Sequence, residues 1–123
     1  MNHVLRFPQS PGLRPIDCGA QPMFDGDVRT RVARSAGAPG EQTVMATEFA
    51  AGSSTVWHSH DTDQTLVVTA GSARLDYADG PIELQAGDVV TVPAGVPHRH
   101  LSSGDQPMTH LSVTGYGRNH LQL

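Results

Sequence analysis

The chain has 123 residues, 37% of them hydrophobic, and a formal net charge of −4, so one domain with one core is expected and a two-domain enzyme is excluded. All eight basic residues are arginine, and the absence of lysine excludes enzymes that need a lysine amine as covalent nucleophile. The single cysteine, Cys18, excludes an internal disulfide and a zinc site built on several thiolates.

The first forty residues are rich in proline and glycine and show no helical repeat of apolar residues. We predict an extended N-terminal arm over residues 1–40, with one candidate strand at Val28 to Ala33. From residue 41 onward the side chains alternate with a period of two, which is typical of half-buried strands. Residues 41–123 are therefore predicted to form a β-barrel.

Short strand-like runs recur after the first alternating segment at Thr43 to Ala50, and Gly, Pro and Asp residues separate them. These runs are Thr55 to His60, Thr65 to Thr69, Ala73 to Tyr77, Ile82 to Leu84, Val89 to Val92, His98 to Leu101 and Thr109 to Thr114. The breaks suit tight turns, since Asp79-Gly80 favours a hairpin and Pro93 with Gly95 favours a type I turn. Many short strands without an amphipathic helix predict an all-β fold, an antiparallel jelly-roll barrel.

Five of the seven histidines fall between positions 58 and 110. His58 and His60 are two apart on a predicted strand, so both imidazoles point to the same face. Gln64 follows after a turn and adds an amide oxygen, and His98 arrives from another hairpin. Three imidazoles and one oxygen leave one or two positions open on a divalent metal, as a catalytic site requires. The pattern therefore predicts metal ligands at these four residues.

Two gapped motifs contain the four predicted ligands. The first consists of Gly52, five residues, His58-Ser59-His60, three residues, Gln64, six residues and Gly71. The second consists of Gly87, five residues, Pro93-Ala94-Gly95, two residues and His98. Both motifs resemble those of the cupin family, with Gln64 where most cupins have Glu and Ser102 in place of the usual Asn. The resemblance implies a single-domain cupin barrel from about Phe24 through Thr114.

Within this family the chain is similar to small cupins with a His, His, Gln, His ligand set, which include the cupin-type hydroxynitrile lyases. The likeness lies in Trp57 to His60, Gln64 to Gly71, Gly87 to Val90, His98 to His100 and Met108 to Leu111. It implies one divalent metal ion as cofactor. We favour manganese and keep nickel, zinc and iron as alternatives, because the ligand types suit all four.

The neutral side chain of Gln64 bears on the reaction. A divalent metal on three imidazoles and an amide keeps a charge of +2, whereas a glutamate ligand would leave the site at +1. A more positive site polarises a bound oxygen more strongly and favours the reduced, divalent state of iron. We therefore expect Lewis-acid chemistry on a substrate oxygen rather than redox cycling.

Two more histidines are candidates for proton transfer. His100 lies two residues beyond His98 and should face the same way, and His110 begins a strand that can bring it to the pocket. Each is either a general base or a donor that orients a metal ligand. His110 and His100 are thus the predicted catalytic residues.

Other residues near the predicted site have either a functional or a purely structural role. Met45, Thr47 and Phe49 share one face of a strand and either line the pocket or pack in the core. Cys18 is expected to be inert, because no residue nearby in the sequence would activate its thiol.

We predict a metal-dependent enzyme that polarises a carbonyl, hydroxyl or enol group of a small molecule, with hydroxynitrile-lyase activity as its most specific form. In this scheme His110 or His100 moves the proton. The sequence is also compatible with two alternative functions. One is a metal-dependent dioxygenase, and the other is a non-catalytic binding or sensor cupin.

Charge and hydropathy set the expected partners. An acidic chain with few arginines is a poor candidate for binding nucleic acid. No apolar stretch of 18 residues occurs, and the first residues lack the apolar run of a secretory signal, so we expect a cytoplasmic protein without a membrane partner. Because small cupins commonly pair, we also expect a homodimer, in which the proline-rich arm could cross to the partner.

Overall fold

The computed structural model describes residues 4–8, 10 and 13–122, and within this part of the chain all regular structure is β. The strands are β1 (Ile16–Asp17), β2 (Phe24–Asp25), β3 (Val28–Arg34), β4 (Gln42–Phe49), β5 (Ser54–Thr55), β6 (His58–His60), β7 (Gln64–Ala70), β8 (Ser72–Tyr77), β9 (Gly80–Gln85), β10 (Val89–Val92), β11 (His98–Ser102), β12 (Met108–Gly115) and β13 (Asn119–Leu121). A search of the described residues finds no helix that is long and apolar enough to cross a membrane.

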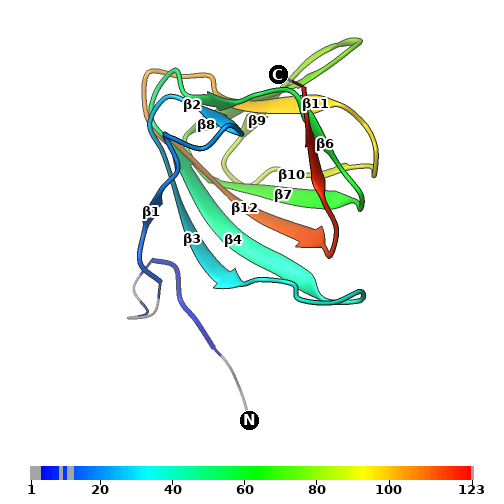
Figure 1. The fold of residues 1–123 in the computed structure, drawn as a ribbon. Coiled ribbons are helices and arrows are strands. Elements are labelled where there is room, and N and C mark those ends of the chain that lie inside the picture. Colours follow the sequence, from blue (N-terminus) through cyan, green and yellow to red (C-terminus); the bar gives the residue numbers. More distant parts are fainter. Residues whose placement is uncertain (1–3, 9, 11–12, 123) are drawn as a thin grey trace.

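The strands form two curled sheets that enclose a common interior (Figure 1). One sheet has the order β1-β3-β4-β12-β7-β10. The other has the order β13-β6-β11-β5-β2, with β8 joined to β11 and β9 joined to β8. β4 pairs with β12 along its whole length, from Phe49 opposite Met108 to Gln42 opposite Gly115. Such antiparallel pairing between strands far apart in the sequence is typical of a jelly roll, so the predicted all-β fold class is confirmed.

The strands predicted beyond residue 41 are all present, and one prediction covers two strands. The run Thr55 to His60 is interrupted, because the Val56 amide donates to the Met23 carbonyl next to β2. The Trp57 carbonyl instead accepts from the Gln122 amide, next to β13. The chain thus changes pairing partners between β5 and β6. Three strands of two or three residues, β1, β2 and β13, have no predicted counterpart.

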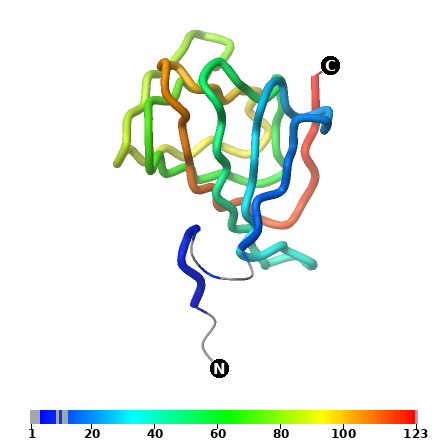
Figure 2. The backbone as a smooth tube through the Cα atoms, turned by 90° about the vertical axis from the view of Figure 1, so that its left-hand side faces the viewer, coloured from blue at the N-terminus to red at the C-terminus, as the bar shows by residue number. Residues whose placement is uncertain are grey.

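The predicted division between arm and barrel at residue 40 falls inside a sheet. β3 pairs with β4 from Val28 opposite Phe49 to Arg34 opposite Val44, with an irregularity near Val32. Cys18 and Val28 are 1% and 0% exposed and pack in the same core cluster as Phe49. The second half of the predicted arm is therefore part of the barrel. The described residues before Leu13 lie to one side of it (Figure 2).

Alternating burial along the strands decides which side chains enter the barrel. In β7, β11 and β12 every second residue from the first is buried over five residues. Some inward positions are apolar and form two clusters, one around Phe49 and Met108 and one around Leu66 and Leu75. Others carry histidine, threonine, serine or glutamine. The barrel interior therefore holds a group of polar side chains in addition to two apolar clusters.

Candidate metal centre

Three strands bring the predicted metal ligands into one place. β6 supplies His58 and His60, and β11 supplies His98, which lies directly opposite His58 in the sheet. β7 begins at Gln64 in the facing sheet. The exposed fractions of these four side chains lie between 0% and 6%. The structure thus brings together the four residues that the sequence predicted as ligands.

The turns that carry the two motifs are tied to each other. Asp63, in the turn before β7, accepts a hydrogen bond from the Ala94 amide at 2.9 Å. The His60 carbonyl accepts one from the Gly95 amide at 2.8 Å. Gly95 has a φ of 77°, a left-handed conformation that favours glycine. These contacts hold the entry to β7 and the turn before β11 in one arrangement, and so fix both halves of the site.

A charged cluster ties β11 to β8. Asp76 accepts hydrogen bonds from Arg74 at 2.7 and 3.0 Å and from Arg99 at 2.6 and 3.1 Å. The bonds from Arg74 first, and then those from Arg99, hold the pKa of this carboxyl below its usual value. The Arg99 guanidinium also lies 5.8 Å from the ring centre of Trp57. Because Arg99 stands between His98 and His100, this cluster fixes the strand that carries both histidines.

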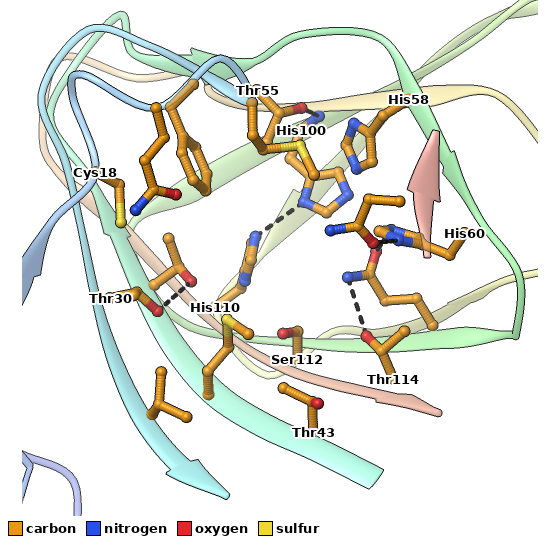
Figure 3. Close-up of a pocket in the computed structure, with 18 of the residues that line it drawn as sticks. Cys18, Thr30, Thr43, Thr55, His58, His60, His100, His110, Ser112 and Thr114 are labelled. Atoms are coloured by element: carbon orange, nitrogen blue, oxygen red, sulfur yellow. Dashed lines mark hydrogen bonds between the residues drawn. The ribbon is translucent and has the colours of Figure 1, made fainter. Parts of the chain in front are cut away.

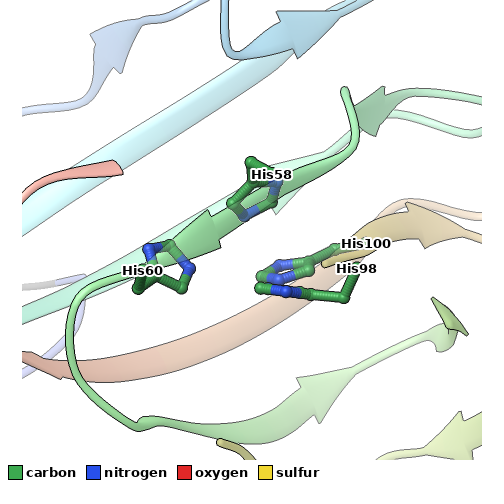
Figure 4. Close-up of side chains that lie close together, drawn as sticks. All are labelled: His58, His60, His98 and His100. Atoms are coloured by element: carbon green, nitrogen blue, oxygen red, sulfur yellow. The ribbon is translucent and has the colours of Figure 1, made fainter. Parts of the chain in front are cut away.

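The ring nitrogens converge on one point. His58, His60, His98 and His100 each offer a nitrogen, and these four atoms lie within 4.8 Å of one another (Figure 4). The Oε1 atom of Gln64 lies 3.1 Å from His60 Nε2 and 3.4 Å from His98 Nε2. Two ligand atoms about 2.1 Å from one metal and at right angles to each other are about 3.0 Å apart. The spacing therefore fits neighbouring ligands on one ion.

The tautomer of each predicted ligand ring is set by a partner on its far side. His58 Nδ1 donates to the Val56 carbonyl at 2.7 Å, and His98 Nδ1 donates to the Val96 carbonyl at 2.9 Å. His60 Nδ1 donates to the Oδ1 atom of Asn119 at 2.7 Å. A neutral imidazole carries only one N–H, so each Nε2 presents a bare lone pair to the centre.

The lone pairs of three Nε2 atoms and of the Gln64 oxygen therefore face one another without a proton between them. Gln64 turns its amide NH2 toward Thr114 Oγ1, at 3.4 Å, and its oxygen toward the rings. Burial lowers the pKa of His58 to about 3 and that of His98 to about 4, so protonation does not relieve the crowding at neutral pH. Buried acceptors without donors are costly. The donor set fits a divalent cation, and the four histidines could bind one.

His100 and His110 form a pair beside this centre. His100 Nδ1 and His110 Nε2 are 3.0 Å apart, and both rings are about 96% buried, with 4% of each exposed. Burial is the main cause that holds the pKa of His100 well below its usual value and lowers that of His110 to about 4. The two outer nitrogens, His100 Nε2 and His110 Nδ1, are buried and have no hydrogen-bond partner among the described residues. Both rings are therefore neutral, and each keeps one buried nitrogen without a hydrogen-bond partner among the described residues.

A cavity of about 390 Å³ opens onto these residues (Figure 3). His58, His60, Gln64, His100 and His110 line it, whereas His98 is completely buried and does not. Among the lining residues that the structure describes there is no Arg, Asp or Glu. The cavity therefore suits an uncharged molecule that reaches the histidines.

The remaining cavity walls show whether the inward residues of β4 line the pocket or pack in the core. Met45, Thr47 and Phe49 all line the cavity, and Phe49 also packs in the core. Cys18 lines it as well, and its thiol donates to the Ile16 carbonyl at 3.4 Å. Burial raises the pKa of this thiol, which agrees with an unreactive cysteine.

Asn119 is the contributor that the sequence did not reveal. It lies on β13, pairs with His60 in the sheet, and accepts the bond from the His60 ring. A three-residue strand near the end of the sequence is too short to give a period-two signal. The match between an asparagine and a histidine 59 positions earlier becomes visible only through the register of β13 and β6.

A jelly-roll barrel with a cluster of inward histidines on facing strands defines a class of small barrel proteins that can hold one metal ion inside. The chain belongs to the cupin family, since the model of the cupin domain matches residues 45–114. This confirms the family that the two motifs indicated.

The chain is similar to one curated enzyme and to several solved structures, among others. The (R)-mandelonitrile lyase of Granulicella tundricola is 34% identical over 106 residues, which cover 85% of this chain and 77% of that protein. A cupin-like protein from Thermotoga maritima has a TM-score of 0.75 at 26% identity, covering 85% of this chain and 82% of the other. A polyketide cyclase from Streptomyces resistomycificus has a TM-score of 0.79 at 20% identity, covering 100% of this chain and 86% of the cyclase. The last likeness shows the fold alone.

Proposed function

We propose that this protein is a metal-dependent lyase of the hydroxynitrile type, which cleaves a small cyanohydrin into an aldehyde or ketone and hydrogen cyanide. The observation that carries the proposal is the neutral histidine pair beside a centre of four converging lone pairs, inside a cavity without charged walls. The lyase relative at 34% identity supports the reaction class.

The proposed metal ligands are His58, His60, Gln64 and His98. Gln64 is included because its oxygen lies within 3.4 Å of two ligand nitrogens. A bound divalent ion would polarise the substrate oxygen and stabilise negative charge on it. We favour manganese, which suits a mixed set of imidazole and oxygen ligands. His100 belongs to the same group of nitrogens, but one side of its ring is committed to His110.

The histidine pair is suited to move a proton in and out. Two neutral rings carry two N–H protons, and one of these lies between His100 Nδ1 and His110 Nε2. The other sits on one outer nitrogen, which leaves the second outer nitrogen bare. The outer nitrogens of the pair therefore always comprise one donor and one acceptor, on two residues that line the cavity.

Cleavage then balances without any other acid or base. The bare nitrogen, His100 Nε2, accepts the hydroxyl proton of the cyanohydrin, the carbonyl forms, and cyanide leaves with the electron pair of the carbon–carbon bond. The shared proton shifts to His110 Nε2, and His110 Nδ1 gives its own proton to cyanide. General acid–base catalysis of this kind contributes about 10² to 10⁴ in rate.

The test uses purified protein loaded separately with manganese, iron, nickel or zinc, and mandelonitrile as the probe. We expect metal-dependent release of benzaldehyde and cyanide without uptake of dioxygen at an oxygen electrode. Stoichiometric oxygen uptake with the iron or nickel form would assign the protein to the dioxygenases. Tight binding of the probe without turnover in every form would indicate a binding or sensor protein, and either result would overturn the proposal.

Exchange of the neutral ligand is expected to separate metal affinity from activity. Gln64→Glu adds a carboxylate and lowers the charge of a divalent site from +2 to +1, so the metal binds at least as tightly and polarises oxygen less. We expect an unchanged or lower dissociation constant for the metal, with a fall of about tenfold in kcat/KM. Chelator competition and steady-state kinetics measure the two. Weaker metal binding together with faster turnover would contradict this account of Gln64.

Asn119 is expected to act as a positioning residue for the metal. Its carbonyl is the only side-chain partner among the three that fix the proposed ligand rings, and Asn119→Ala removes it. We expect metal affinity to fall by about 10- to 100-fold, the usual range for such outer partners. Asn119→Asp keeps the acceptor and should recover most of the affinity. Nitrogen NMR of the His60 ring should show mixed tautomers in Asn119→Ala, and a single tautomer with unchanged affinity would contradict the prediction.

A further inference from the structure

The cavity has a second polar region away from the proposed metal ligands. In Figure 3, His58 and His60 lie at one side of the cavity and Cys18 and Thr30 lie at the other, with His110 between them. Thr30 and Thr47 are 8% and 3% exposed and both line the cavity. Inward hydroxyl groups that lie this deep in a barrel call for an account of their hydrogen bonds.

Sheet register places these groups in one row. Thr30 lies opposite Thr47 in the pairing of β3 with β4, and Thr47 lies opposite His110 in the pairing of β4 with β12. His110 in turn contacts His100 at 3.0 Å. Directly opposite residues have Cβ atoms about 5 Å apart, so the row leads from the histidine pair across two strands to Thr30.

The hydroxyl and thiol protons at this end of the cavity are already used in hydrogen bonds. The Thr30 hydroxyl donates to the Ala46 carbonyl at 3.2 Å, so the contact of 3.1 Å between Thr30 and Thr47 takes its proton from Thr47. The Thr47 oxygen is left with lone pairs and no donor. The Cys18 thiol donates its proton to the Ile16 carbonyl, so it has none left for a ligand. Thr30, Thr47 and Cys18 therefore offer acceptors only, whereas the amide of Gln21, an exposed residue that also lines the cavity, can donate.

The surroundings limit what can meet these acceptors. Phe24, Phe49 and Met45 line the same cavity, and its described walls carry no Arg, Asp or Glu. The ring centres of Phe24 and Phe49 are 6.2 Å apart, and Phe49 lies 5.2 Å from the ring of His110. An apolar, flat body fits between these side chains. An anionic group at this end would meet lone pairs without a cation, which is unfavourable.

We infer that Thr47 forms a specificity site for the substrate end that is remote from the metal, and that the natural substrate is an uncharged aromatic carbonyl or cyanohydrin carrying a hydroxyl group on its ring. The ring hydroxyl donates to Thr47 Oγ1 while the reacting oxygen faces the histidines. The inference rests on the proposed function for the reacting end and on the proton count for the remote end.

The test measures binding to the metal-loaded protein by calorimetry at slightly acidic pH, where the phenols stay uncharged. The probes are 3- and 4-hydroxybenzaldehyde, their methyl analogues and 4-carboxybenzaldehyde. We expect at least one hydroxy probe to bind about tenfold tighter than its methyl analogue, as one hydrogen bond in a buried site provides. The carboxy probe should bind at least tenfold more weakly than 4-hydroxybenzaldehyde.

Two variants locate the preference. Thr47→Val keeps the side-chain shape and removes the oxygen, so it should reduce the preference for hydroxyl over methyl to less than about twofold. Ser112→Ala removes another buried hydroxyl that lines the cavity and should leave the preference unchanged. Equal binding of hydroxy and methyl probes to the wild type, or a full preference in Thr47→Val, would overturn the inference.

The outcome is separable from that of the proposed function, because binding is measured without turnover. A clear hydroxyl preference in a protein that does not cleave mandelonitrile would sustain the remote site and refute the lyase. Cleavage without any hydroxyl preference would sustain the lyase and refute the remote site.

Discussion

His98→Ala is expected to abolish stoichiometric metal binding and leave the barrel folded. The ring is completely buried, its Nδ1 is held by the Val96 carbonyl, and its Nε2 faces the oxygen of Gln64. Removal of one of four ligands from a site with open positions leaves too few donors to hold a divalent ion against water. Elemental analysis should give less than about a tenth of one equivalent, and His58→Ala should behave in the same way.

The apolar core is separate from these ligands, so the fold should survive. Phe49, Val68 and Met108 pack in one cluster and Leu66 with Leu75 in another, and neither includes a proposed ligand. Circular dichroism should therefore match the wild type. Added manganese should raise the melting temperature of the wild type through linkage and leave that of His98→Ala unchanged. His120→Ala is the matched control, since His120 is an exposed histidine that pairs with Asp61.

Full metal occupancy in His98→Ala would refute the proposed ligand set. Retained occupancy in this variant but loss in His100→Ala would instead assign the fourth position to His100, which lies in the same cluster of nitrogens. The two variants thus decide whether His98 or His100 completes the ligand set.

The proposed ligands were accessible to sequence reasoning because the evidence for them is local. Two histidines at a spacing of two share a strand face, and the turn at Pro93 to Gly95 precedes His98 by a fixed spacing. Burial in β6 and β11 follows this alternation, with both histidines of each strand inward. A sequence can therefore indicate which side chains enter a barrel.

Pairing between strands that are distant in the sequence cannot be predicted from such local patterns. Asn119 reaches His60 only because β13 pairs with β6, and Thr47 meets His110 only because β4 pairs with β12. The strands β1 and β2 have two residues each, so alternation cannot be recognised in them. For this reason the sequence pattern predicts an arm over the first forty residues, although Cys18 and Val28 are core residues.

Removal of the His110 ring is expected to slow turnover more than any other substitution that leaves the metal in place. His110→Ala removes the partner of His100 and one of the two nitrogens through which the proposed relay exchanges protons. We expect kcat to fall by about 10² to 10⁴, the usual contribution of general acid–base catalysis. Metal content should stay at the wild-type level, because His110 is not among the four clustered histidines.

A second substitution separates proton transfer from support of the His100 ring. His110→Asn can still offer an amide N–H toward His100 Nδ1, but an amide does not pass a proton between two nitrogens. If His110 takes part in the chemistry, the asparagine variant should be as slow as the alanine variant, at equal metal content and in the same cyanohydrin assay. If His110 only orients His100, the asparagine variant should recover most of the rate. That recovery would make His110 a positioning residue and leave His100 as the group that contacts the substrate.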